Sequence, residues 1–322
     1  MKSQQILSKF IKGISGHSRI NHLAVILILV IASLELGCSS NAQPQPFDWK
    51  QVELAIGKAG AVQSDGVYKI GLPRTDLHVK VGDVEVQPTL ALGSWVAFRK
   101  LAVETIVMGD LVLTEDEVEP VMAKLQDGNI EITALHNHLL NENPRVMYMH
   151  IDGRGDAVKL AQAIHAALAL SRTPLTAPAP AASPEPVNLD TRALDQIIGR
   201  AGKINGGVYQ FSIARGEKIA AGELKNGAEP IPASMGLATA INFQPTGTDT
   251  AAITGDFVLL GSEVNPVINA LRQNGIAVTA VHSHMLDDSP RLFFLHFWAN
   301  DTALKLARGL RAALDKTNSA KP

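Results

Sequence analysis

"GDLVLTEDEVEPVMAKL", residues 109–125, carries the pattern that decides the fold. An apolar, β-rich stretch leads up to Thr114, and Thr114 with Glu117 forms the Thr-x-x-Glu capping box that begins many helices. We therefore expect a strand followed at once by a helix. The Gly109-Asp110 dipeptide predicts a turn that breaks the strand, because glycine supplies unusual dihedrals and aspartate caps neighbouring amides.

The same pattern returns as "GDFVLLGSEVNPVINAL" at residues 255–271, displaced by 146 positions. The displacement holds without a gap into the helical patterns "DAVKLAQAIHAAL" (156–168) and "TALKLARGLRAAL" (302–314). Earlier segments match with small gaps, such as "GVYKI" (66–70) with "GVYQF" (207–211). The chain therefore contains two copies of one domain-sized unit.

These matches divide the chain of 322 residues into a first copy at 46–171 and a second at 189–317. Between them, residues 172–188 carry five prolines among Ala, Ser and Thr, which is typical of an extended linker. Residues 1–42 precede both copies and are interpreted separately below.

Within a copy, alternating or β-rich segments predict strands, and apolar residues at helical spacing predict helices. The succession of elements indicates an α+β sandwich, in which helices pack on an antiparallel sheet. We expect two tandem homologous domains of this class, with a ferredoxin-like topology, permuted or not.

The N-terminal 42 residues resemble an export signal. Four basic residues precede the apolar core "LAVILILVIASL" (23–34), which is short for a membrane span but suits a secretory signal peptide. Cys38, the only cysteine, follows directly and resembles the lipidated cysteine of a bacterial lipoprotein, although Glu35 departs from that pattern. Cleavage after Ala42 is the alternative. Either way we expect an extracytoplasmic protein, which is a membrane-anchored lipoprotein or is periplasmic or secreted.

Composition excludes some function classes. The formal net charge is −2 and no run of Lys or Arg occurs, so we expect no nucleic-acid partner. Membrane contact is expected only through a lipid anchor on Cys38. With a single cysteine, no intramolecular disulfide can form.

Histidines gather in one motif of each copy: "LHNHLLNENPRVMYMH" (135–150) and "VHSHMLDDSPRLFFLH" (281–296). Six of the ten histidines belong to these motifs: His136, His138, His150, His282, His284 and His296. In a strand, His136 and His138 point to one face, and a returning strand that pairs Ala134 with His150 brings the third histidine to the same face. We expect Ile130 and Ile132 on that face too.

Three neutral imidazoles around one point are the ligand set of a zinc, copper or iron site. The sequence therefore predicts two metal sites, one in each copy, as the only cofactor. Two pairs of carboxylates are candidates for a fourth ligand: Asp110 with Asp256, and Glu117 with Glu263. The alternative interpretation is six structural histidines that are hydrogen-bonded into their loops.

Arg145 and Arg291 each follow a proline in the motif. A guanidinium beside imidazoles suits a small anionic ligand, which it binds through two hydrogen bonds. The alternative role is to brace the loop.

The tandem motifs, each followed by a Leu- and Ala-rich helix, resemble the LppY/LpqO family of exported bacterial lipoproteins. The resemblance covers residues 48–314 and implies an exported, often lipid-anchored protein. It implies no activity, because the function of that family is unknown.

Three hypotheses follow, and the sequence leaves enzyme activity open. The first is an extracytoplasmic protein that binds a transition metal or a small ligand at duplicated histidine sites. The second is a metalloenzyme that acts on a small anionic substrate. The third is an interaction module of the cell envelope without small-molecule chemistry.

Overall fold

The computed structural model describes residues 47–175, 187–220 and 230–320. The expected signal at 1–42, Cys38 and most of the expected linker lie outside these described residues. Within the described ranges, no helix combines the length and the apolar character that a membrane crossing requires.

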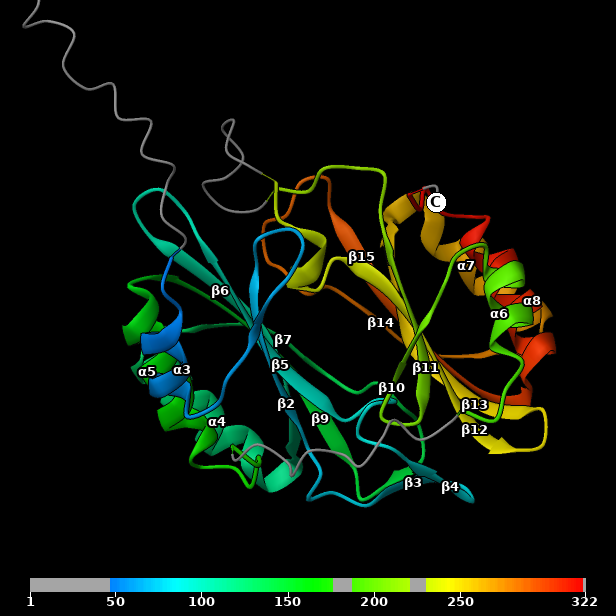
Figure 1. Cartoon of the computed structure of the whole chain (residues 1–322), viewed down its shortest axis with the longest axis horizontal. Coiled ribbons are helices and arrows are strands. Elements are labelled where there is room, and N and C mark those ends of the chain that lie inside the picture. Colours follow the sequence, from blue (N-terminus) through cyan, green and yellow to red (C-terminus); the bar gives the residue numbers. More distant parts are fainter. Residues whose placement is uncertain (1–46, 176–186, 221–229, 321–322) are drawn as a thin grey trace, which may run out of the picture. The chain divides into compact units, whose positions relative to one another are not determined.

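The two copies contain matching series of helices and strands (Figure 1). The first copy comprises α3 (Lys50–Ile56), β1 (Ala61–Val62), β2 (Tyr68–Pro73), β3 (Val79–Val81), β4 (Val84–Val86), β5 (Gly93–Lys100), β6 (Thr105–Thr114), α4 (Glu115–Asp127), β7 (Glu131–His136), β8 (Glu142–Asn143), β9 (Val146–Gly155) and α5 (Ala157–Leu168). The second comprises α6 (Thr191–Ile198), β10 (Lys203–Asn205), β11 (Val208–Ala214), the 3-10 helix η3 (Ala233–Met235), β12 (Ala238–Gly247), β13 (Thr250–Leu260), α7 (Gly261–Gln273), β14 (Ala277–His282), β15 (Leu292–Thr302) and α8 (Ala303–Leu314).

Each copy forms one antiparallel sheet, with strand orders β1-β2-β5-β6-β9-β7 and β10-β11-β12-β13-β15-β14. The expected class, two tandem α+β domains with helices on antiparallel sheets, is confirmed. The order β5-β6-β9-β7 is that of a ferredoxin-like sheet whose last strand has moved to the front of the chain. The topology is therefore ferredoxin-like and permuted. Strands β4, β3 and β8 form a small second sheet in the first copy, and the described residues of the second copy show no equivalent of it.

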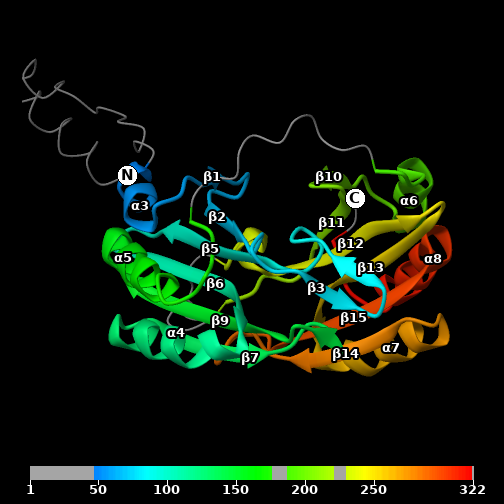
Figure 2. The ribbon, with the colours of Figure 1, turned by 90° about the horizontal axis from the view of Figure 1, so that it is seen from below.

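Helices cover only one face of each sheet (Figure 2). In the first copy, α3, α4 and α5 cover a core that includes Phe98, Leu111 and Ile151. In the second, α6, α7 and α8 cover a matching core. The opposite faces of the two sheets pack together, since two further buried clusters each mix residues of both copies. The result is four layers, with the two sheets inside and the helices outside.

Register places the histidines on the inner faces. Ala134 pairs with His150, as the sequence predicts, and Ala280 pairs with His296 in the second copy. A bulge between Ile132 and Ala134 shifts the earlier part of β7, so that Ile132 pairs with Ile151. The expectation that Ile130 and Ile132 share the histidine face is therefore wrong, because the bulge turns both toward the helices.

The Gly-Asp dipeptides do not form turns, and that expectation is also wrong. Gly109-Asp110 and Gly255-Asp256 lie inside the continuous strands β6 and β13. Glycine is needed there for close approach: a Cβ on Gly255 would lie 2.0 Å from the backbone oxygen of Ala240. The missing side chain lets two strands meet tightly beside each aspartate.

Glu117 and Glu263 each form a buried ion pair that stabilises the fold. Glu117 completes the expected capping box of α4 and also accepts hydrogen bonds from Arg74, 2.7 Å from Nη1. Arg215 donates to Glu263 in the same way, also at 2.7 Å. Both carboxylates are committed to buried ion pairs, so the structure assigns them to the fold rather than to a metal.

Candidate metal centre

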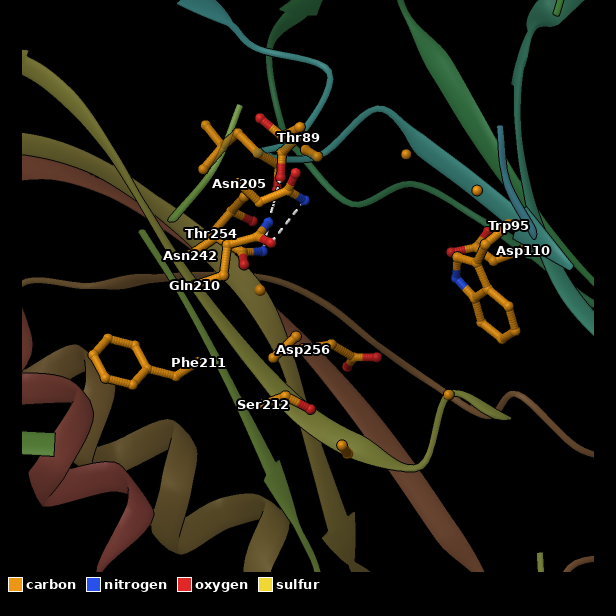
Figure 3. A pocket seen from close by; sticks show the side chains of 18 of the residues that line it. Thr89, Trp95, Asp110, Asn205, Gln210, Phe211, Ser212, Asn242, Thr254 and Asp256 are labelled. Atoms are coloured by element: carbon orange, nitrogen blue, oxygen red, sulfur yellow. Dashed lines mark hydrogen bonds between the residues drawn. The ribbon is translucent and has the colours of Figure 1, made fainter. Parts of the chain in front are cut away.

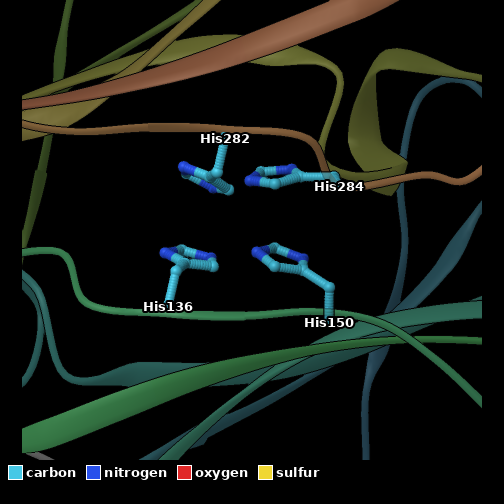
Figure 4. A group of neighbouring side chains, drawn as sticks. All are labelled: His136, His150, His282 and His284. Carbon is cyan, nitrogen blue, oxygen red and sulfur yellow. The ribbon is translucent and has the colours of Figure 1, made fainter.

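The six motif histidines meet in one place, between the two sheets. Figure 4 shows His136 and His150 of the first copy facing His282 and His284 of the second. Where the sequence predicts two separate sites, the structure brings both triplets into a single cluster. Together with Asp110 and Asp256, these histidines are called the histidine centre below.

The three closest pairs of histidine rings each join the two copies. Ring centroids are 3.5 Å apart for His136 and His282, 3.8 Å for His138 and His296, and 3.6 Å for His150 and His284. Because every pair crosses the interface, the centre exists only where both copies are assembled.

The two aspartates come from the central strands of the sheets. Asp110 pairs with His150 across β6 and β9, and its Oδ2 lies 3.9 Å from the Nε2 of His138 and 4.0 Å from that of His150. The equivalent Asp256 pairs with His296 and lies 3.5 Å from the Nε2 of His284. The sequence offered two pairs of carboxylates as candidates for a fourth ligand. Of these, Asp110 and Asp256 are the pair that lies beside the imidazoles.

Backbone carbonyls orient the third histidine of each motif. The Nδ1–H of His296 donates to the carbonyl oxygen of Gly255 at 2.8 Å, and His150 makes the equivalent bond to Gly109. A carbonyl only accepts, so Nδ1 carries the proton and Nε2 keeps a free lone pair. This arrangement, in which the second ring nitrogen is fixed by a hydrogen bond, is usual for histidines that bind metals.

Buried polar atoms without a hydrogen-bond partner gather at this centre. In the described part of the chain, all such side-chain atoms belong to its eight residues: Asp110 Oδ1, His136 Nε2, His138 Nε2, His150 Nε2, Asp256 Oδ1, His282 Nδ1 and Nε2, His284 Nε2 and His296 Nε2. Each unsatisfied atom costs about 1–3 kcal/mol. Such a concentration marks a site for a ligand that satisfies many nitrogen and oxygen atoms at once.

The electrostatics suit a cation. Burial lowers the pKa of every histidine in the centre, to about 4 at His136 and about 3 at His296, so the rings are neutral at pH 7. Burial raises the pKa of Asp110 to about 7 and that of Asp256 well above its usual range. Neutral imidazoles with lone pairs, beside two carboxylates, form a typical transition-metal ligand set.

The ligand atoms form three overlapping groups, within which we define two sets that the duplication relates. Set one, His136, His138 and His296, has one nitrogen from each ring within 4.8 Å of the others. Set two, His150, His282 and His284, lies within a second such group that also includes His136. A shift of 146 positions exchanges the two sets. Each set takes two histidines from one copy and the third from the other.

Arg145 and Arg291 lie in the motif loops, and Arg291 donates to Ser283, which lies between two histidines of the centre. Arg291 donates to the carbonyl oxygens of Met285 and Leu286 and to Asp288, and so braces its own loop. The half-exposed Arg145 lies 4.0 Å from Glu115. Ligand binding by these arginines stays a prediction.

A pocket of about 800 Å³ opens beside the centre, between the two sheets. Figure 3 shows Trp95 and Asp110 on one wall, with Ser212, Asn242 and Asp256 on the other. Apart from the two aspartates, sequence reasoning missed these residues, because they carry no motif. The one sequence signal for the pocket was that matched strand positions carry different residues in the two copies, such as Lys69 and Gln210.

The fold and centre define a two-copy α+β protein with a composite histidine site. The chain belongs to the family described as Domain of Unknown Function (DUF1259), whose model matches residues 50–170 and again 192–316. No curated protein matches it.

Two solved structures align with much of the chain. The trimeric bacterial microcompartment shell protein PduB is 14% identical, with 82% of this chain and 96% of that chain covered and a TM-score of 0.21. EtuB from Clostridium kluyveri is 9% identical, with 79% and 90% covered and a TM-score of 0.18. Likeness at these TM-scores carries no argument about fold or function.

Proposed function

We propose that this protein binds two transition-metal ions, zinc, copper or iron, at a centre that its two copies build together. One observation carries the proposal: the unpartnered buried polar atoms of the described chain all belong to the eight residues of the histidine centre. Metal coordination satisfies such atoms directly, whereas structural histidines would be hydrogen-bonded into their surroundings.

In this proposal, set one and set two each hold one ion. Each set supplies three imidazole nitrogens, and Asp110 and Asp256 lie where they can complete or balance the coordination. Three protein nitrogens leave a coordination position open in a tetrahedral site.

Elemental analysis of untagged protein tests metal binding. We expect about two equivalents of one metal per chain, and the same two equivalents in a His78→Ala control, which removes an exposed histidine outside the centre. Protein that holds no metal, and whose melting temperature does not change with added zinc, copper or iron, would reject the proposal. An envelope interaction module would then be the better hypothesis.

Two double variants test how the ligands are shared. His138→Ala with His296→Ala removes two members of set one, so one tight equivalent should remain in set two. His138→Ala with His150→Ala takes one histidine from each set, so neither ion should bind tightly. If each copy instead formed its own site from its own triplet, the two results would be reversed.

We also propose that this protein acts outside the cytoplasm, because of its N-terminal sequence, and that it belongs to the LppY/LpqO family, because of its tandem histidine motifs. The basic start, the apolar core at 23–34 and Cys38 support export with lipid attachment. The mass of the mature N-terminal peptide tests this. A diacylglyceryl cysteine at position 38 supports an anchored lipoprotein, a mature chain that begins after Ala42 supports a secreted one, and an intact Met1 contradicts both kinds of cleavage.

A further inference from the structure

The pocket beside the histidine centre reaches only one of the two metal sets. Two members of set one, His138 and His296, line it, together with Asp110 and Asp256. None of the three histidines of set two contributes to its wall. A ligand in the pocket would therefore contact histidines of set one and none of set two.

Cross-strand rows explain why space is left here. The row that ends at Asp110 runs through Gly71 and Trp95, and the matching row that ends at Asp256 runs through Ser212 and Ala240. Three of these four flanking positions carry small side chains, so the inner faces do not fill the gap. At about 800 Å³, the space has the size of a typical small-molecule site.

One cation is built into the pocket wall. The ammonium group of Lys69 lies 3.9 Å from the centre of the Trp95 ring and donates to the carbonyl oxygen of Ser234 at 3.0 Å. Two of its three donors remain for a ligand. The second copy carries the neutral Gln210 at the matching position, and its only lysine in the lining, Lys203, is exposed.

The remaining lining favours a small organic anion over inorganic phosphate. Trp95 supplies aromatic surface, and Ser212 and Thr254 supply hydroxyl groups (Figure 3). Among the described residues that line the pocket, none is an arginine, the usual partner of phosphate. A metal held by set one and the half-buried ammonium of Lys69 at the same pocket suit a molecule with two carboxylates.

We propose that this pocket binds a small dicarboxylate, with one carboxylate on the metal of set one and the other on Lys69. The inference rests on the proposed metal binding. Lys69 then positions the ligand, and the ion of set two stays out of its reach.

Cobalt-substituted protein provides the test, because the visible spectrum of Co²⁺ responds to a new ligand. We expect succinate to change the spectrum saturably and inorganic phosphate to leave it unchanged. Lys69→Met should weaken succinate binding by at least about tenfold, the effect of one lost charged contact. The control Lys203→Met, which removes an exposed lysine at the pocket, should change it by less than about twofold.

A second variant fills the pocket. Ala240→Trp places in the second copy the side chain that Trp95 already supplies at the matching position of the first. It should keep both cobalt equivalents and lose the response to succinate.

The outcomes separate the two proposals. Two bound cobalt ions with no response to succinate, or with a response to phosphate alone, overturn the pocket proposal and leave metal binding intact. A succinate response that Lys69→Met and Ala240→Trp leave unchanged also overturns it. If added cobalt does not bind and the visible spectrum does not change, both proposals are overturned.

Discussion

The two copies share their frame and their metal-ligand candidates, yet they differ in the side chains around them. Beside the stacked histidines, the first copy has Tyr148 where the second has Phe294. On the pocket walls, the first copy has Trp95 where the second has Ala240. The comparison teaches that both copies hold the centre, while their divergence makes the two walls of the pocket chemically different.

The largest expected effects come from the buried ion pair of each copy. Glu117→Gln should lower the free energy of unfolding by about 4 kcal/mol and Glu263→Gln by about 3 kcal/mol, because each leaves a buried arginine short of charge. The first effect is larger since the Glu117 side chain is 4% exposed and that of Glu263 is 11% exposed. Denaturant unfolding measures both, and equal losses would contradict the ranking.

Acid should weaken the first of these pairs. Burial alone would raise the pKa of Glu117, but hydrogen bonds from Arg74 and from backbone amides lower it below its ordinary value of 4.5. The stabilisation is therefore complete above pH 4.5 and is lost as the pH falls through the lower folded value. The difference in unfolding free energy between wild type and Glu117→Gln should shrink below pH 4.5. A difference that stays constant down to pH 3 would refute this.

The glycines of the two Gly-Asp dipeptides should differ in how much stability an alanine costs at each. Gly255→Ala should cost about 3 kcal/mol and Gly109→Ala about 1 kcal/mol, because the new methyl group meets a carbonyl at 2.0 Å in the first case and 2.9 Å in the second. Thermal unfolding monitored by circular dichroism can rank the two variants. If both variants are equally stable, the close approach of strands β12 and β13 at Gly255 does not set the cost of the added methyl group.

Exchanging the aromatic residues should give the smallest effects. Phe294→Tyr buries a hydroxyl within an apolar cluster and should cost about 2 kcal/mol. Tyr148→Phe loses only the hydrogen bond from its hydroxyl to the carbonyl of Ala91, at 3.0 Å, and should cost about 1 kcal/mol. Metal content should stay at two equivalents in both variants, and a lost equivalent would show that these rings take part in the site.

Sequence reasoning reached the duplication, the fold class and the pairing of Ala134 with His150, because these follow from self-similarity and from the two-residue period of strands. It failed where geometry departs from that period. The bulge before Ala134 and the close approach at Gly255 depend on neighbouring strands, which no local pattern reveals.

The composite nature of the centre was out of reach for a different reason. Self-comparison shows that two segments are alike, but it does not show which surfaces they turn toward each other. The pairing of His138 with His296 depends on how the inner faces pack, and the pocket depends on side chains that match no motif, such as Lys69.

Each set takes one of its three histidines from the other copy, and this has a consequence for a protein that contains a single copy of the domain. One copy produced alone would hold only two imidazoles of one set and the third of the other, and could complete a site only by forming a two-fold symmetric homodimer. Joining the copies in one chain turns that concentration-dependent association into an intramolecular one. The tandem chain can therefore bring the six histidines together at protein concentrations at which a homodimer of single copies would dissociate.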